Sequence, residues 1–213
     1  MTKIDLHLAI NTISDVVENR PPAIRAHDQI YMKFGDLLLQ AEIVSRWFDK
    51  QDVVFIGDGD AIGLSIMYLK KRKVLEPGPN KITLLDFDER VVNSVNGFAS
   101  RNEMKGNIEA ELYNVADPLP KQHWQKHTCF YTNPPFGSCN DACSVKVFVR
   151  RGIEAVKDNA YGCIVVADHH EKEWSQRNLM TIQKDVLSKG FIVKEMQPQF
   201  HKYHLEDNPD LTS

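Results

Sequence analysis

A run of apolar residues that breaks into a glycine-rich turn is the feature that most restricts how this chain can fold. Residues 53–56 read Val-Val-Phe-Ile, residues 57–60 read Gly-Asp-Gly-Asp, and apolar residues at helical spacing begin after Gly63. This order is typical of a parallel strand that enters a ligand-binding loop at the edge of an α/β sheet. Gly57 and Gly59 let the backbone approach a ligand closely, because they carry no Cβ atom.

The same turn carries two acidic side chains, Asp58 and Asp60. Like charges repel, so two carboxylates disfavour the diphosphate of NAD or ATP at this position. A positively charged ligand is favoured instead. The turn therefore predicts a cationic ligand rather than an ordinary dinucleotide.

Length and composition exclude several classes of protein. The chain has 213 residues, enough for one α/β domain with a small extension, and its net charge of −3 gives no overall basic footprint for nucleic acid. No stretch approaches the ~18 apolar residues of a membrane span, and the N-terminus lacks the apolar core of a signal peptide. We therefore expect a cytoplasmic protein without a membrane partner. Its four cysteines form no CxxC pair, which favours free thiols: Cys129, Cys139, Cys143 and Cys163.

Strand and helix patterns alternate along the chain from residue 51. This alternation is typical of a three-layer α/β sandwich, in which a mostly parallel sheet has helices on both faces. We expect residues 1–50 to be a helical extension and residues 51–213 to be the domain itself. Seven strands are expected, at 53–56, 82–87, 108–113, 128–132, 162–167, 191–196 and around 200–205. Helices are expected at 2–19, 36–49, 62–71, 89–100, 144–156 and 173–188.

Five polar clusters follow strands of the predicted sheet. In parallel sheets ligands bind beyond the carboxyl ends of the strands, so we expect these clusters to converge on one rim. After the second strand, we assign Asp86 to the two ribose hydroxyls of a nucleoside and Asp88 or Glu89 to the cap of the next helix. The clusters are the 57–63 turn, Asp86 with Asp88, residues 114–117, residues 133–137 and residues 168–170.

A second informative motif, Asn133-Pro134-Pro135-Phe136-Gly137, follows the fourth expected strand. Two prolines make a rigid, extended turn without amide donors of its own. The Asn133 side chain and the Pro134 carbonyl oxygen are then fixed hydrogen-bond acceptors that face an amine. Phe136 can stack on a flat base or shield a cation. The loop therefore predicts a reaction at an amino nitrogen.

The glycine-rich turn, the acidic tip of the second strand and the Asn-Pro-Pro-Phe loop together resemble the class I fold that binds S-adenosylmethionine. The loop is similar to that of methyltransferases that act on exocyclic or side-chain amino groups, and residues 133–137 resemble the RNA adenine members. This resemblance implies a class I methyltransferase-like (Rossmann-like) fold with a seven-stranded sheet. It also implies S-adenosylmethionine as co-substrate and a nucleic-acid base as acceptor.

More of the chain resembles the branched-chain polyamine synthase family, whose bis(aminopropyl)spermidine synthases use decarboxylated S-adenosylmethionine on the same fold. The resemblance runs from about residue 27 to the C-terminus and includes residues 201–203. Two positions depart from the family pattern, because Gly59 separates the acids of the first turn and Asn133 stands in place of Asp. From the length of 213 residues we expect no counterpart of the family's separate N-terminal winged-helix domain in this sequence. The matching segments, in order, are His27-Asp28-Gln29, Phe55–Asp60, Asp86–Arg90, Asp117–Pro120 and Asn133–Pro135.

The resemblance also implies roles for the residues of the rim. One acid of the first turn anchors the ammonium group of the donor, the other receives a proton from the acceptor nitrogen, and no metal is implied. Donor contacts are expected from Gly57, Asp58, Gly59, Asp60, Asp86, Phe87, Asn114 and Asp117. Catalytic contacts are expected from Asp58, Asp60, Asn133, Pro134, Pro135 and Phe136, and acceptor contacts from Asp168, His169, His170 and Glu171.

Charge distinguishes the two donors. S-adenosylmethionine brings a carboxylate to the first turn, where two unit charges ~4 Å apart interact by roughly 1 kcal/mol in water and ~4 kcal/mol at an effective dielectric near 20. The decarboxylated donor brings only an ammonium group, which favours aminopropyl transfer to a polyamine. Neutral Asn133 favours the alternative, N-methylation of an adenine-type amino group in nucleic acid. A third hypothesis is a non-catalytic nucleoside-binding protein, and a homodimer is a possible assembly.

Two further histidines, His123 and His127, have the spacing of metal ligands on a helix. No third ligand or helical context accompanies them. We therefore expect both side chains at the solvated surface and no metal site.

Overall fold

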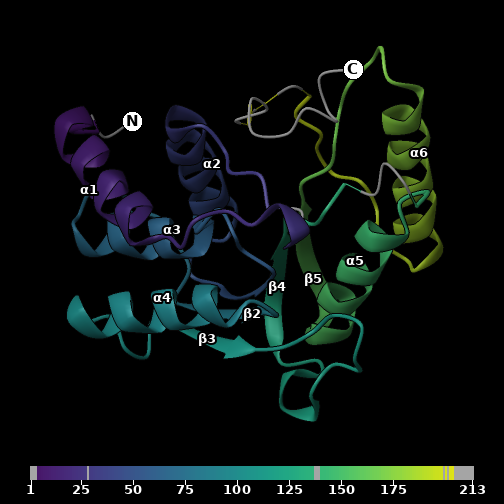
Figure 1. Cartoon of the computed structure of the whole chain (residues 1–213). Coiled ribbons are helices and arrows are strands. Elements are labelled where there is room, and N and C mark those ends of the chain that lie inside the picture. Colours follow the sequence, from purple (N-terminus) through teal and green to yellow (C-terminus); the bar gives the residue numbers. More distant parts are fainter. Residues whose placement is uncertain (1–3, 28, 137–139, 199, 201, 204–213) are drawn as a thin grey trace.

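The computed structural model of the chain describes residues 4–27, 29–136, 140–198, 200 and 202–203 (Figure 1). The strands in this part of the chain are β1 (Asp52–Ile56), β2 (Lys81–Asp86), β3 (Ile108–Leu112), β4 (His127–Thr132) and β5 (Val156–Ile164). The helices are α1 (Leu6–Asn19), α2 (Phe34–Trp47), α3 (Ile62–Lys71), α4 (Glu89–Arg101), α5 (Cys143–Ala155) and α6 (Glu173–Ser188). Two short 3-10 helices are η1 (Arg25–His27) and η2 (Lys121–His123).

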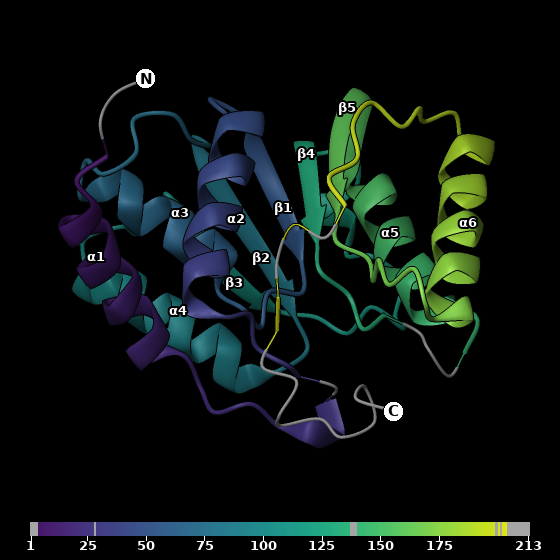
Figure 2. The same ribbon diagram turned by 90° about the horizontal axis from the view of Figure 1, so that it is seen from above.

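The five strands form one parallel sheet in the order β3-β2-β1-β4-β5 (Figure 2). β1 lies in the centre, where Val53 pairs with Ile82 of β2 and with Cys129 of β4. The last four residues of β1 are buried, which explains why this strand is an unbroken apolar run. The order of the strands reverses between β1 and β4, and ligands of open α/β sheets bind at such a switch point.

Helices cover both faces of this sheet, as Figures 1 and 2 show. α3 and α4 pack on one face, and α1 and α2 lie against α3 as a further layer. α5 packs on the other face, with α6 beside it. Alternate residues of β1 face the two layers: Val53 and Phe55 belong to the core with α3 and α4, and Val54 and Ile56 to the core with α5. The prediction of an α/β fold with a parallel sheet is confirmed.

Most elements lie where the sequence pattern predicts them. α3 and α6 have the predicted bounds, because both are long runs with regular apolar spacing. β5 differs from its predicted range, 162–167. It begins at Val156, because α5 ends at Ala155 and the chain continues directly into extended backbone.

The prediction of seven strands is wrong for the part of the chain that the structure describes. Residues 191–196 form no strand, and Ile192 is 82% exposed. A stable strand pairs through its backbone and buries one face, so apolar content alone does not produce one. The strand predicted around 200–205 lies partly outside the described residues; within them, Tyr203 forms an isolated antiparallel bridge with Met32.

The first fifty residues, predicted as an extension, pack against the rest of the fold. Ile13 of α1 and Leu37 of α2 are fully buried in the same core as Val53 of the central strand. The boundary at residue 50 stays a prediction. None of the helices that the structure describes combines the length and apolar character needed to cross a membrane.

The prediction that His123 and His127 are solvated is wrong. Both are buried, their ring centroids are 5.6 Å apart, and His127 Nε2 lies 3.4 Å from His123 Nδ1. His123 Nε2 lies 3.0 Å from Glu111 Oε2. Burial lowers the pKa of His127 to about 4. Among the described residues no group of three His, Cys, Asp or Glu is placed to hold a metal ion.

Candidate active site

The first turn leaves β1 in a conformation that requires glycine. Gly57 has φ = +72°, in the left-handed region, and its N–H donates to Leu85 O of β2 at 2.8 Å. A Cβ atom at this position would also lie 3.0 Å from the Phe148 ring. Ala61, which precedes α3, has φ = +62° without the freedom of glycine. The neighbouring strand and the following helix therefore hold this loop in a strained shape.

Asp58 connects the loop to the helix that follows it. Its Oδ1 accepts from Ile62 N at 2.8 Å and its Oδ2 from Gly63 N at 2.7 Å, two of the free amides at the start of α3. Its own N–H donates to Asp86 Oδ2 at 3.1 Å. Burial raises the pKa of Asp58 well above its ordinary value. Both oxygens of this carboxylate therefore already have a backbone partner.

The two acids after β2 have separate contacts. Asp86 Oδ2 accepts from Asp58 N and Oδ1 accepts from Asp88 N at 2.9 Å, and burial raises the pKa of Asp86. Asp88 caps α4 by accepting from Arg90 N, as predicted, and it also binds the Arg90 guanidinium and Gln29 Nε2. These donors hold the pKa of Asp88 far below its usual range. Asp88 is therefore engaged by its own helix and by Gln29, and Asp86 is the acid of this pair that lines the cavity described below.

Asp60 joins two segments that are far apart in the sequence. Its Oδ1 accepts from Met32 N at 2.7 Å, and its Oδ2 accepts from Asn133 Nδ2 at 2.8 Å. Arg20 Nη1 lies 3.8 Å from Oδ1 and donates to the Asp60 carbonyl oxygen. Burial outweighs these contacts and raises the pKa of Asp60 to about 6. Asp60 can therefore change its protonation state near neutral pH.

Two helices, α5 and α6, donate hydrogen bonds to the diproline loop, residues 133–136. Ser144 Oγ of α5 donates to Pro135 O at 3.1 Å, and Asn178 Nδ2 of α6 donates to Phe136 O at 3.0 Å. These bonds occupy two carbonyl oxygens of a loop that has no amide donors at its prolines. The loop is therefore rigid at the point where it meets the first turn.

The start of the same loop presents acceptors to the site. Asn133 is turned so that its NH₂ group donates to Asp60 and, at 2.9 Å, to Tyr203 Oη. In the described part of the chain no donor reaches Asn133 Oδ1 or the Pro134 carbonyl oxygen. Both atoms can therefore accept a hydrogen bond from an amine.

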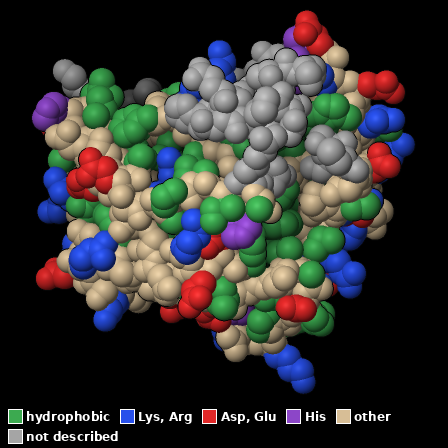
Figure 3. Space-filling view, viewed as in Figure 1, with side chains coloured by type: hydrophobic (Ala, Val, Ile, Leu, Met, Phe, Trp, Pro, Cys, Tyr) green, Lys and Arg blue, Asp and Glu red, His purple; other side chains and the backbone are tan. Residues whose placement is uncertain are grey.

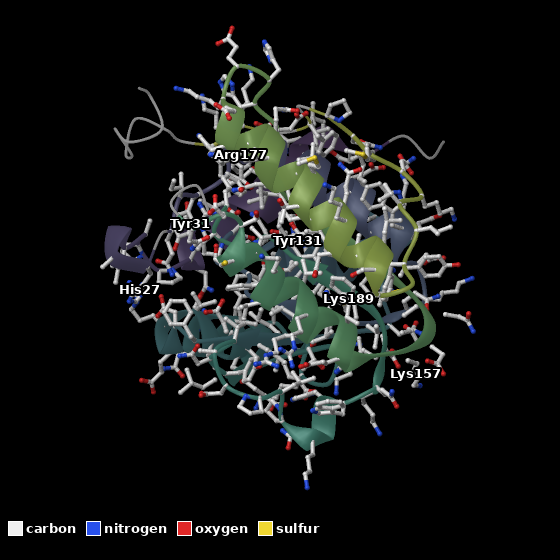
Figure 4. The ribbon with its side chains drawn as sticks, turned by 90° about the vertical axis from the view of Figure 1, so that its right-hand side faces the viewer. His27, Tyr31, Tyr131, Lys157, Arg177 and Lys189 are labelled. Carbon is white, nitrogen blue, oxygen red and sulfur yellow. The ribbon has the colours of Figure 1, made fainter. Side chains whose placement is uncertain are left out.

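The segment between α1 and α2 crosses the mouth of the site, and we call residues 20–27 and 29–33 the strap. Gln29 of the strap donates to Asp88 at 2.9 Å, and Tyr31 and His27 line the site. Figure 4 shows His27 and Tyr31 on one side of the molecule and Lys157, near the start of β5, on the other. The strap therefore lies at the carboxyl ends of the strands.

These segments enclose a cavity of about 380 Å³. Three carboxylates line it, those of Asp58, Asp60 and Asp86, and none of its described lining residues is Lys or Arg. Phe87 and Tyr113 add flat aromatic surfaces. On the face of the molecule in Figure 3, Lys and Arg side chains are scattered rather than gathered into one patch. The cavity therefore suits a ligand with a flat ring and a positive charge.

Most of the residues predicted for the donor and the reaction lie in this cavity. Asn114 and Asp117 do not; they are exposed on the loop after β3, while Tyr113 and Val115 of that loop line the wall. The Asn114 side chain accepts from Ala116 N. The predicted residues that line the cavity are Gly57, Asp58, Gly59, Asp60, Asp86, Phe87, Asn133, Pro134, Pro135 and Phe136.

The residues predicted to contact the acceptor lie farther out. Asp168 and His169 line a larger groove beside β5, and His170 and Glu171 are exposed in the same loop. The rings of His169 and His170 stack with centroids 5.8 Å apart in this loop. None of the four lines the 380 Å³ cavity.

Sequence reasoning does not identify several aromatic residues of the cavity wall. Phe148 reads as part of an apolar helix face, and Tyr31 as part of a linking segment. Trp174 begins α6 and Tyr203 lies near the C-terminus, far in sequence from any motif of the first turn. The sequence signal that could have indicated these residues is their aromatic type, since aromatic side chains beside a ligand-binding loop often provide flat contact surfaces.

The fold and the site together define a class of protein, an α/β protein of the methyltransferase-like Rossmann type with an acidic first turn. Comparison with known protein families identifies the family within this class. The chain belongs to the family of the branched-chain polyamine synthase A C-terminal domain, which matches residues 9–212.

Two relatives in this family are N(4)-bis(aminopropyl)spermidine synthases. The protein from Thermus thermophilus is 26% identical over 188 residues, which cover 87% of this chain and 50% of the relative. The protein from Methanocaldococcus jannaschii is 27% identical over 150 residues, which cover 70% of this chain and 39% of the relative. The chain therefore spans half or less of the length of these relatives.

Solved structures confirm the fold. The branched-chain polyamine synthase from Thermus thermophilus, in complex with N4-aminopropylspermidine and 5′-methylthioadenosine, superposes with a TM-score of 0.75 at 24% identity, over 92% of this chain and 53% of that one. A SAM-dependent methyltransferase from Aquifex aeolicus superposes with a TM-score of 0.51 at 15% identity, over 90% of this chain and 95% of that one. The fold is therefore of the methyltransferase-like Rossmann type, with five parallel strands in the described residues.

Proposed function

We propose that the chain is an aminopropyltransferase, which moves an aminopropyl group from decarboxylated S-adenosylmethionine to an amino nitrogen of a polyamine. The acidic cavity carries this proposal, because three aspartates line it and none of its described lining residues is Lys or Arg. Two relatives bear the names of aminopropyl-transferring synthases. One related enzyme was solved with a polyamine and with 5′-methylthioadenosine, the nucleoside that remains when the decarboxylated donor loses its aminopropyl group.

The charge of the cavity separates the two donors. A carboxylate about 4 Å from the Asp60 carboxylate is repelled by roughly 4 kcal/mol at an effective dielectric near 20, and an ammonium group is attracted by a similar amount. Arg20, the cation beside Asp60, lies on the strap and is not among the described residues that line the cavity. The cavity therefore favours the donor that lacks a carboxylate.

Different residues of the cavity bind different parts of the nucleoside. Asp86, at the tip of β2, is placed to accept hydrogen bonds from the two ribose hydroxyls. Phe87 and Tyr113 provide flat surfaces for the base. Gly57 and Gly59 let the backbone of the first turn lie close to the sulfonium side of the ligand.

The transfer is an in-line displacement at carbon. The lone pair of the acceptor nitrogen forms the new N–C bond while the C–S bond breaks, and the sulfur leaves as a neutral thioether. For that lone pair to be free, the acceptor nitrogen, which is an ammonium group in neutral solution, first gives one proton to the Asp60 carboxylate. Asn133 Oδ1 and the Pro134 carbonyl oxygen orient the nitrogen during attack. No covalent intermediate with the enzyme is needed, so positioning provides most of the rate.

Calorimetry with three nucleosides tests the choice of donor. We expect decarboxylated S-adenosylmethionine to bind at least about fivefold more tightly than S-adenosylmethionine, since one carboxylate is repelled by roughly 1–4 kcal/mol. Mass spectrometry of a reaction with spermidine is expected to show one or two added aminopropyl groups. Binding of the carboxylate-bearing donor alone would exclude the proposal.

A pair of variants separates the two acids of the first turn. Asp60→Asn is expected to weaken the decarboxylated donor far more than 5′-methylthioadenosine, which has no ammonium group. Asp58→Asn is the matched control. Because Asp58 accepts two amides at the start of α3, this variant is expected to weaken both nucleosides equally through the shape of the loop. Equal losses in the Asp60 variant would contradict its contact with the ammonium group.

A second candidate function is N-methylation of an adenine-type amino group. The two acceptors at Asn133 Oδ1 and the Pro134 carbonyl oxygen favour it, because they suit a weakly basic NH₂ group that donates two hydrogen bonds. Retention on RNA or DNA columns with loss of binding at increasing salt would support this function. The net charge of −3 argues against it.

A homodimer also stays a prediction, which sedimentation equilibrium can test.

A further inference from the structure

Two hollows of the molecule share a wall of aromatic side chains. Beside the 380 Å³ cavity lies a groove of about 1230 Å³, bordered by β5, α6 and residues 189–198. Among the described residues, three line both hollows: Phe136, Trp174 and Tyr203. We call these three residues the aromatic junction. They come from the diproline loop, the start of α6 and the C-terminal segment, so only the folded chain brings them together.

Contacts with neighbouring side chains hold the junction in place. Phe136 and Tyr203 meet edge to face, with ring centroids 5.7 Å apart and planes at 80°. Asn178 of α6 holds the Phe136 carbonyl oxygen, four residues after Trp174 on the same helix. Asn133 donates to the Tyr203 hydroxyl and to Asp60. A single side chain, that of Asn133, therefore links the junction to Asp60, the acid that we propose as proton acceptor.

The size of the cavity requires a second space for the acceptor. Ligand pockets usually have volumes of about 300–1,000 Å³, and 380 Å³ lies near the lower limit. That volume holds a nucleoside, but it does not also hold a long amine beside it. An acceptor whose nitrogen lies next to Asn133 must therefore extend out of the cavity. The space next to the cavity is the groove on the other side of the aromatic junction, and the acceptor can extend into it.

The chemistry of the junction suits an alkyl chain that carries ammonium groups. Aromatic faces attract cations and also pack against methylene groups, and a polyamine alternates these two elements. The outer wall of the groove bears both signs of charge, including Asp158, Asp168, Lys157 and Lys194. The described lining residues of the groove include four lysines and three acids, so they give no net attraction for a polycation. Selection therefore rests on the rings and on the acids of the cavity.

We propose that the aromatic junction threads the acceptor polyamine from the groove beside β5 into the donor cavity, with Trp174 as a residue that selects long amines. This inference rests on the proposed aminopropyl transfer. It adds the path of the acceptor and the reason for a preference among amines. A short diamine reaches Asn133 without filling the junction, whereas spermidine spans it.

Tryptophan fluorescence tests contact between the acceptor and the junction directly. The chain has three tryptophans, so Trp47→Phe with Trp124→Phe leaves Trp174 as the only indole. Trp47 also lines the groove, and phenylalanine keeps an aromatic ring there. With 5′-methylthioadenosine bound, spermidine is expected to change the emission of this variant with saturation, and uncharged 1,8-octanediol is not. Unchanged emission in a variant that still aminopropylates spermidine would overturn the proposal.

Kinetics with two acceptors tests selection. Trp174→Leu is expected to raise KM for spermidine at least tenfold and KM for propane-1,3-diamine less than threefold, while Trp174→Phe restores spermidine KM to within threefold of the original. Trp124→Leu, a change at an exposed residue that lines neither hollow, is the matched control and is expected to change neither KM.

The outcomes distinguish the two proposals. If Trp174→Leu raises both KM values equally, or raises neither, the threading proposal is wrong although the enzyme is an aminopropyltransferase. If the original chain transfers no aminopropyl group to any amine, the proposed function itself is wrong, and the threading proposal is rejected with it.

Discussion

The affinity of the cavity for a cationic nucleoside is expected to rise about tenfold between pH 5 and pH 7. Asp60 has a pKa of about 6, so roughly one tenth of it is ionised at pH 5 and roughly nine tenths at pH 7. The ammonium group of the decarboxylated donor binds the ionised form, so its affinity follows the ionised fraction. The affinity for 5′-methylthioadenosine, which has no ammonium group, is expected to stay within about twofold over this range.

Three variants assign this pH dependence to Asp60. Asp60→Asn is expected to remove the slope and to leave the weak affinity of the low-pH state at every pH. Arg20→Gln is expected to move the midpoint to higher pH, because the Arg20 charge lowers the pKa of Asp60. His27→Gln is the control, since His27 is the one histidine among the described residues that line the cavity, and the slope is expected to remain.

Calorimetry at pH 5, 6 and 7 measures the effect, and buffers of different ionisation enthalpy count the protons. At pH 6 about half of Asp60 is protonated, so binding of the cation is expected to release about half a proton. Parallel pH dependence for both nucleosides would refute the reasoning. A slope that survives in Asp60→Asn would refute it as well.

Two further predictions concern the stability of the fold. A Cβ atom at Gly152 of α5 would lie 2.4 Å from the Phe130 ring, so Gly152→Ala is expected to destabilise the protein by about 1–3 kcal/mol. Gly97→Ala, also inside a helix but facing a flexible side-chain end, is expected to stabilise it by up to about 1 kcal/mol, and denaturant titration compares the two. The pKa of His127 is lowered to about 4, so its contribution to the unfolding free energy falls by about 2–3 kcal/mol as the pH drops from 7 to 4.5. His127→Gln is expected to lose that part of the pH dependence; identical pH profiles for the two proteins would contradict it.

The central part of the fold could be predicted from sequence because local patterns determine it. β1 is an unbroken apolar run that is buried on both faces, and α3 begins where the glycine-rich turn ends. The residues of this turn follow the strand directly, so their place at the rim is fixed by chain connectivity. The same holds for Asn133, which follows β4.

The edges of the sheet could not be predicted in this way. Residues 191–196 are apolar enough for a strand, but whether they pair depends on what lies beside β5. The burial of His127 also depends on packing beyond its own strand, since its ring stacks on that of His123, which in turn contacts Glu111 of β3. The spacing of the two histidines suited metal ligands, and the lack of a third ligand or helical context led to the prediction of a surface pair. Long-range packing therefore decided what the local pattern left open.

The hydrogen bonds of the three cavity acids could not be read from the motif either, and they couple ligand binding to the fold. Asp58 holds the start of α3, Asp86 joins the loops after β1 and β2, and Asp60 joins the strap to the diproline loop. Burial raises the pKa of each. Between its ordinary and its raised pKa each folded acid binds more protons than the unfolded one, so its contribution to stability falls as pH rises through that window. A bound ammonium group offsets this loss, because it favours the ionised carboxylates. Asp60, the acid that selects the cation, is therefore also the group through which that cation stabilises the strap and the diproline loop.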